Sequence, residues 1–94
     1  MGTFIVAAQE PPAGKEPERV EFRMHPNPVY DGVVYIESNL DGPRTIRIYD
    51  LFGKTVLERR LDSGKLHLGS LIPGVYMVQL RQKGQLATKK LVIR

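Results

Sequence analysis

The two histidines carry the side chains best suited to acid–base or metal chemistry. His25 precedes a Pro-Asn-Pro segment, and His67 lies between two leucines. A zinc site needs several His or Cys ligands at short spacing, and a catalytic histidine needs a positioned partner group. Neither pattern surrounds either histidine in the sequence. We therefore predict no catalytic residue, no metal site and no cofactor, and we expect both histidines to lie at the surface.

Four aspartates lie within three positions of a glycine, which raises the question of a calcium site. Calcium needs several oxygens that converge from one loop, and the Asp-x-Asp-x-Asp-Gly pattern that supplies them is absent. An aspartate beside a glycine is typical of a turn, where its carboxylate accepts hydrogen bonds from nearby backbone N–H groups. We therefore expect turns, not a metal site, at Asp31, Asp41, Asp50 and Asp62.

The charge is distributed unevenly along the chain. Its 94 residues contain no cysteine and suffice for one small domain held by packing alone. Residues 20–94 carry twelve cations and seven anions, and no Asp or Glu follows residue 63. Such an excess suits nucleic acid or anionic lipid, and the four tyrosines could stack on bases. Small domains also carry charge for solubility, and tyrosines often span core and rim, so we predict no nucleic-acid partner.

Short segments of alternating apolar and polar residues predict β-strands. In the first, Val20, Phe22 and Met24 share one face. Residues 33–38 are partly apolar on both faces, which predicts a central strand. Residues 54–61 bury either Val56 or the pair Leu57 and Leu61. About seven strands separated by turn signals predict an all-β antiparallel sandwich. The segments identified are 20–24, 33–38, 44–49, 54–61, 75–80 and 86–93, with the last two joined as a hairpin.

Residues 1–19 differ in composition from the rest. Residues 9–18 contain three prolines and no large apolar side chain, which predicts a linker. Residues 3–8 are apolar. Three interpretations of them stay open: the last strand of an upstream domain, a tag remnant, or an extra strand that pairs with an exposed sheet edge. Pairing with a neighbouring molecule would give a weak homodimer. Because residues 1–8 are too short for a signal peptide, we expect the chain to be part of a longer protein.

Three separated motifs resemble the C-terminal sorting domains of cargo proteins of the Bacteroidetes type IX secretion system. The first is a Pro-Asn-Pro segment after the first strand, and the second is a hairpin with the pattern apolar-Tyr-Asp-apolar-x-Gly-Lys. The third is a Gly-x-Tyr strand, a glycine turn and a Lys-Lys-apolar ending. The resemblance covers residues 20–94 and leaves residues 1–19 unexplained. The motif residues are Pro26, Asn27, Pro28, Tyr49, Asp50 and Gly53, and in the last motif Gly74, Tyr76, Gly84, Lys89, Lys90, Leu91, Val92, Ile93 and Arg94.

The resemblance implies a small immunoglobulin-like sandwich and a function without catalysis. A sorting domain of this family directs a fused upstream cargo through the periplasm and across the outer membrane, to the surface of a Gram-negative bacterium or the medium. Its partners are the type IX translocon and a surface sortase, which would cut the linker at residues 9–19. The alternative is a carbohydrate- or surface-binding sandwich module of an extracellular enzyme. That alternative needs exposed aromatic residues, and the chain has no tryptophan.

Two interpretations of the pair Lys89 and Lys90 stay open. Lysine at a sheet edge blocks the addition of further strands, which would make the pair a structural device. The resemblance instead places the pair in the ending that the secretion machinery recognises, and the motif of residues 74–94 would then be the recognition motif. Because strand residues alternate between faces, Lys89 should share a face with Leu91 and Ile93.

Limited proteolysis should cut residues 9–18 first, because prolines and charged side chains disfavour the hydrogen-bonded pairing that protects a backbone from proteases. Mass spectrometry of the earliest fragments identifies the site. Earliest cuts within residues 33–80 would contradict a domain that begins at residue 20.

Overall fold

The computed structural model describes residues 19–94, which form seven strands and two antiparallel sheets. This range contains no helix that could cross a membrane. The expectations of a linker and of an extra strand concern residues that lie outside the described range. The strands are β1 (Phe22–His25), β2 (Val33–Ser38), β3 (Arg44–Tyr49), β4 (Thr55–Leu61), β5 (Lys65–His67), β6 (Gly74–Gln82) and β7 (Gln85–Ile93).

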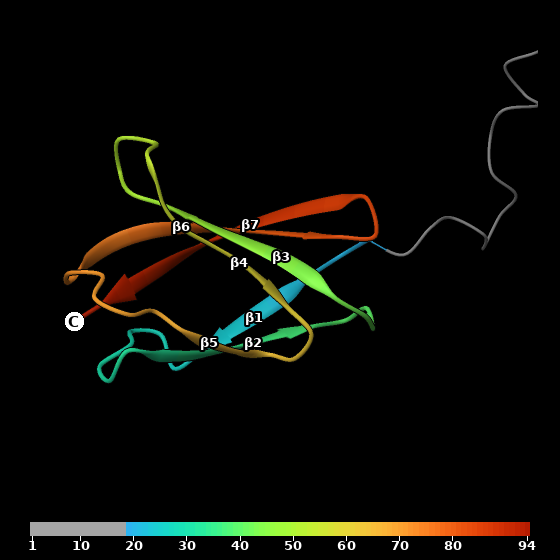
Figure 1. Cartoon of the computed structure of the whole chain (residues 1–94), viewed down its shortest axis with the longest axis horizontal. Coiled ribbons are helices and arrows are strands. Elements are labelled where there is room, and N and C mark those ends of the chain that lie inside the picture. Colours follow the sequence, from blue (N-terminus) through green and yellow to red (C-terminus); the bar gives the residue numbers. More distant parts are fainter. Residues whose placement is uncertain (1–18) are drawn as a thin grey trace, which may run out of the picture.

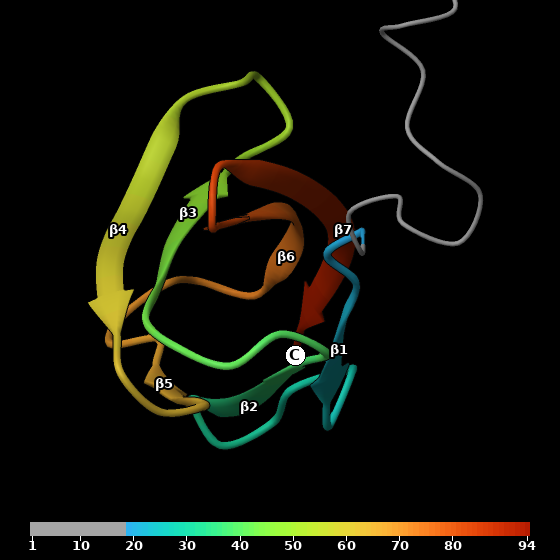
Figure 2. The ribbon, with the colours of Figure 1, turned by 90° about the vertical axis from the view of Figure 1, so that its right-hand side faces the viewer.

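The two sheets pack face to face as a sandwich, as Figures 1 and 2 show. One sheet has the strand order β1-β2-β5, and the other has the order β4-β3-β6-β7. This is an immunoglobulin-like order in which the fourth strand pairs with the third. The prediction of an all-β sandwich is confirmed, and β2 is the central strand of its sheet, as its two apolar faces indicated.

The core lies between the two sheets and is built from alternate strand residues. Alternate residues in the middle of β2, β3 and β6 are buried, whereas the residues between them are more exposed. This period of two is the pattern that a strand with one buried face requires. The residues with no exposed surface are Val29, Val34, Ile36, Ile46, Ile48, Val78, Leu80 and Leu91.

Strands β4 and β5 were not fully predicted from the sequence. The pairing of β3 with β4 shifts between Ile48 and Tyr49, so that Val56 has no partner in the register. Val56 and Leu57 are therefore both half-buried against the core, where alternation alone allowed only one of them. Strand β5 was not assigned from the sequence, because only its central residue, Leu66, is buried.

The predicted turns are present where aspartate and glycine occur together. Asp50 Oδ1 accepts hydrogen bonds from the backbone N–H groups of Phe52 and Lys54, both at 2.9 Å. Gly53 closes this turn with a φ of 85°, a conformation that favours glycine. Asp31 Oδ1 similarly accepts from Val33 N at 3.3 Å. Both carboxylates thus act locally on the backbone, as expected from the sequence.

Gly64 allows β2 to approach the turn between β4 and β5. The Ile36 N–H donates to Gly64 O at 2.7 Å. A Cβ atom at position 64 would lie 2.6 Å from Ile36 O, which is shorter than any ordinary contact. Because the clashing atom belongs to the backbone of the central strand, it cannot rotate away.

We expect Gly64→Ala to destabilise the domain by about 1–3 kcal/mol, the usual range for an overpacked site. Urea unfolding followed by circular dichroism measures the change. Ser63→Ala is the matched control, since Ser63 is the exposed neighbour in the same turn. Equal stability of the two variants would contradict this close approach.

Candidate recognition surface at the C-terminal hairpin

Strands β6 and β7 form one hairpin that runs the length of the sandwich. Gly74 pairs with Ile93 at one end, and Gln82 pairs with Gln85 at the other, next to the turn that contains Gly84. Gly84 and Arg94 therefore lie at opposite ends of β7. The predicted recognition motif is one continuous hairpin, but its members do not converge on a single point.

Tyr76 anchors the start of this hairpin. Its ring is 5% exposed, and its hydroxyl donates to Ile72 O at 2.6 Å. A tyrosine near the start of the sixth strand that bonds to the backbone a few residues upstream is the tyrosine corner of immunoglobulin-like sandwiches. Its register partner Leu91 has no exposed surface. Both residues hold the hairpin to the core.

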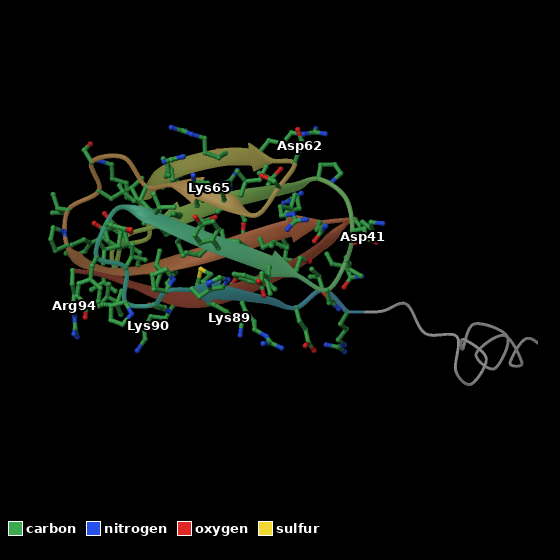
Figure 3. All side chains as sticks on the ribbon, turned by 90° about the horizontal axis from the view of Figure 1, so that it is seen from below. Asp41, Asp62, Lys65, Lys89, Lys90 and Arg94 are labelled. Carbon is green, nitrogen blue, oxygen red and sulfur yellow. The ribbon has the colours of Figure 1, made fainter. Side chains whose placement is uncertain are left out.

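The cations at the end of the chain point away from the sandwich in Figure 3. The register places Lys89 opposite the buried Val78, on the same face as Leu91, and places Lys90 on the outer face. The predicted division of faces is thus confirmed. Lys89, Lys90 and Arg94 are all exposed, and none forms an ion pair with a carboxylate of residues 19–94.

Residues of the Pro-Asn-Pro motif cover part of the outer edge of β7. The Asn27 side-chain amide donates to Lys90 O at 3.1 Å and accepts from Val92 N at 3.0 Å. Val29 continues this pairing, since its N–H donates to Val92 O and its carbonyl accepts from Arg94 N, both at 2.8 Å. Asn27 thus imitates a strand residue, and Val29 forms a parallel bridge with Ile93. We call residues 27–29 the strap.

Among residues 19–94, no strand pairs with the outer side of the first half of β7. There a groove of about 440 Å³ separates β7 from β1. Figure 2 shows these two strands side by side at one lateral edge of the sandwich. The lining of the groove is mixed. Its apolar residues are Val20, Phe22 and Ala87, and its polar residues are Glu21, Arg23, Glu37, Ser38, Asn39 and Lys89. Lys89 is on the same face of β7 as the buried Leu91, but its side chain is exposed and lines the groove.

The remaining motif residues support the opposite part of the larger sheet. The Tyr49 hydroxyl donates to Gln79 Oε1 at 3.4 Å across β3 and β6. It also accepts from Arg47, which bonds Glu58 at 3.0 Å. These bonds to Tyr49 and Glu58 raise the pKa of Arg47 above its usual value. Asp50 and Gly53 therefore shape the β3–β4 turn, whereas Tyr49 links β3 to β6.

The contact between His25 and Glu37 was not predicted from the sequence. His25 Nε2 lies 3.2 Å from Glu37 Oε2, and its ring stacks on Tyr35 with centroids 5.6 Å apart. The sequence showed no partner for His25, because Glu37 is brought beside it only by the β1–β2 register. Both side chains are more than half exposed, as expected for a surface histidine. Residues 19–94 contain no cluster of three potential metal ligands.

Asn27→Ala should loosen the end of β7, because Lys90 O and Val92 N lose their side-chain partners. We expect a loss of about 1 kcal/mol in the free energy of unfolding, the usual net value of such hydrogen bonds. Hydrogen exchange at Val92 should accelerate more than exchange at Leu80.

Asn39→Ala is the matched control for this variant. Asn39 also bonds to backbone with its side chain, at Glu21 N and Arg19 O, but at the other end of the sandwich. It should destabilise the domain without a selective effect on Val92. Selective exchange at Val92 in both variants would refute the role assigned to Asn27.

Comparison with known proteins agrees with this geometry. No curated protein matches the chain. A family model described as the secretion system C-terminal sorting domain matches residues 23–94, a range that includes all seven strands apart from the first residue of β1. This family carries a signal for export to the cell surface or the extracellular space. The chain therefore belongs to the family of C-terminal sorting domains of the type IX secretion system.

Proposed function

We propose that the secretion machinery recognises the exposed side chains at the end of β7, and that the domain acts without catalysis. The observation that supports this proposal is the strap. It occupies the outward backbone groups of Val92 and the amide of Arg94. A receptor therefore cannot add a strand along this part of the edge while the strap is bound. The side chains of Lys89, Lys90 and Arg94 stay accessible.

The buried members of the motif have another role in this proposal. Tyr76, Leu91 and Ile93 are at most 6% exposed, so a receptor cannot contact them in the folded domain. We assign these residues to the fold and the three cations to recognition. An exposed, unpaired cation contributes little to folding stability. Its replacement can therefore separate recognition from folding.

The wider pathway in this proposal follows from the sorting role. A fused cargo crosses the periplasm, the type IX translocon exports it, and a surface sortase removes the domain within residues 9–19. That linker lies almost entirely outside the described residues, so its scissile bond is not assigned. A role in carbohydrate binding is the competing function, and the export experiment separates the two.

Lys89→Gln/Lys90→Gln should reduce surface export of a fused periplasmic reporter in a type IX competent host. The expected change in the free energy of unfolding is within about 0.5 kcal/mol per exposed residue. Surface labelling of whole cells measures export, and thermal unfolding of the purified chain measures stability. Deletion of residues 93–94 is a poorer test, since Ile93 is buried and Arg94 bonds to the strap.

Arg59→Gln/Lys65→Gln removes the same charge from exposed positions on β4 and β5 and should leave export unchanged. Gly84→Val supplies the opposite control, because Gly84 has a φ of 78° and a β-branched residue strains the turn. Export that merely follows stability across these variants would contradict recognition through the cations. Export independent of the whole domain would exclude the sorting role itself.

A further inference from the structure

A second cluster of cations surrounds a pocket at the other end of the hairpin. The pocket has a volume of about 210 Å³ and lies where the start of β3, the end of β4 and the β6–β7 turn meet. Its lining contains four cationic residues and no carboxylate. These are Arg44, Arg60, Arg81 and Lys83, together with Pro43, Thr45, Gln82 and Gly84.

Three of the lining residues stand in one row across the sheet. Thr45 on β3 is the register partner of Arg60 on β4 and also of Arg81 on β6. Neighbouring strands lie about 4.8 Å apart. The guanidinium groups of Arg60 and Arg81 can therefore both reach a ligand placed at the Thr45 hydroxyl between them. A guanidinium presents paired N–H donors that match two oxygens of a phosphate. The row can thus surround one oxyanion from both sides.

None of the pocket cations forms an ion pair with a carboxylate of residues 19–94. Asp41 and Asp62 lie at the same end of the sandwich in Figure 3, but neither forms an ion pair with them. Arg47, by contrast, is paired with Glu58 on the same sheet. Arg44 Nε is also buried without a hydrogen-bond partner. The cluster therefore has unused positive charge and at least one unused donor.

The base of the pocket is held by a buried glutamine. Gln82 is 1% exposed, and its amide donates to Leu40 O and Gly42 O, both at 3.0 Å. Ser38 Oγ donates to its carbonyl oxygen. These bonds fix the loop between β2 and β3 against the end of β6. The same loop holds Arg44, whose guanidinium donates a hydrogen bond to Gly42 O at 3.0 Å.

We propose that this pocket binds a phosphoryl group, carried by free phosphate or by the head group of an anionic phospholipid. Two guanidinium groups, a lysine and a hydroxyl match the charge and the several acceptor oxygens of that group. The proposal does not depend on the sorting role, because it rests on the lining of the pocket alone.

The first test is an NMR titration of the ¹⁵N-labelled chain with inorganic phosphate. We expect saturable shifts at the amides of Thr45, Arg81, Lys83 and Gly84. Arg60→Gln/Arg81→Gln should weaken binding by at least about tenfold, since each variant removes charged hydrogen bonds. Thr45→Val keeps the charge and should weaken binding by a smaller factor.

Arg23→Gln/Lys65→Gln is the matched control, because it removes equal charge from the outer face of the other sheet. It should retain binding within about twofold, because neither residue lines the pocket. Thermal unfolding of every variant confirms that each is folded.

Vesicles decide between the two sources of the phosphoryl group. Binding to phosphatidylglycerol vesicles that the pocket variant loses and the control variant keeps assigns a lipid head group. Phosphate shifts without such vesicle binding assign a free phosphate. No pocket-localised shift in either arm, or equal weakening by the pocket and control variants, overturns the proposal.

Discussion

Hydrogen bonds between the strap and β7 connect the end of the chain to the segment that follows β1. Residues 27–29 leave the smaller sheet after β1 and bond to the edge strand of the larger sheet. These backbone and amide bonds therefore join the two sheets directly, in addition to the apolar contacts between them. An edge strand with unpaired N–H and C=O groups is otherwise open to foreign strands. In this domain the chain covers that edge itself where the terminal motif lies.

The strap also determines which part of the terminal motif a partner can contact. Without it, the last residues of β7 would present both backbone and side chains, and strand addition would be the simplest mode of binding. With the strap in place, the backbone of Val92 is hydrogen-bonded and Ile93 is buried. The exposed groups at this end are the side chains of Lys89, Lys90 and Arg94. Asn27 and Val29 cover the edge beside Lys90, whereas Lys89 lies next to the uncovered part of the edge, where lysine can still block strand addition.

Local patterns made the strands predictable, whereas contacts between distant residues could not be inferred. Alternation identified β2 and β3 with their observed bounds, because each has one fully buried face. The bonds of Asn27 join residues 63 and 65 positions apart, and no periodicity encodes them. The same applies to the basic pocket, whose cations come from β3, β4, β6 and the β6–β7 turn. The bulge beside Tyr49 was also hidden, since it changes which residues of β4 face inward.

The β6–β7 hairpin carries both proposed sites, and its rigidity relates them. Arg81 and Lys83 border the basic pocket at one end, whereas Lys90 and Arg94 lie toward the other. Leu86 is the register partner of Arg81, and Lys89 and Lys90 follow it by three and four residues, so the two groups begin roughly 10 Å apart along β7. This separation is slightly larger than the Debye length of about 8 Å at physiological salt. The repulsion between the two groups of charges is therefore largely screened in solution. If both proposals hold, a partner bound at the end of β7 and a phosphoryl group in the pocket occupy different ends of the same hairpin.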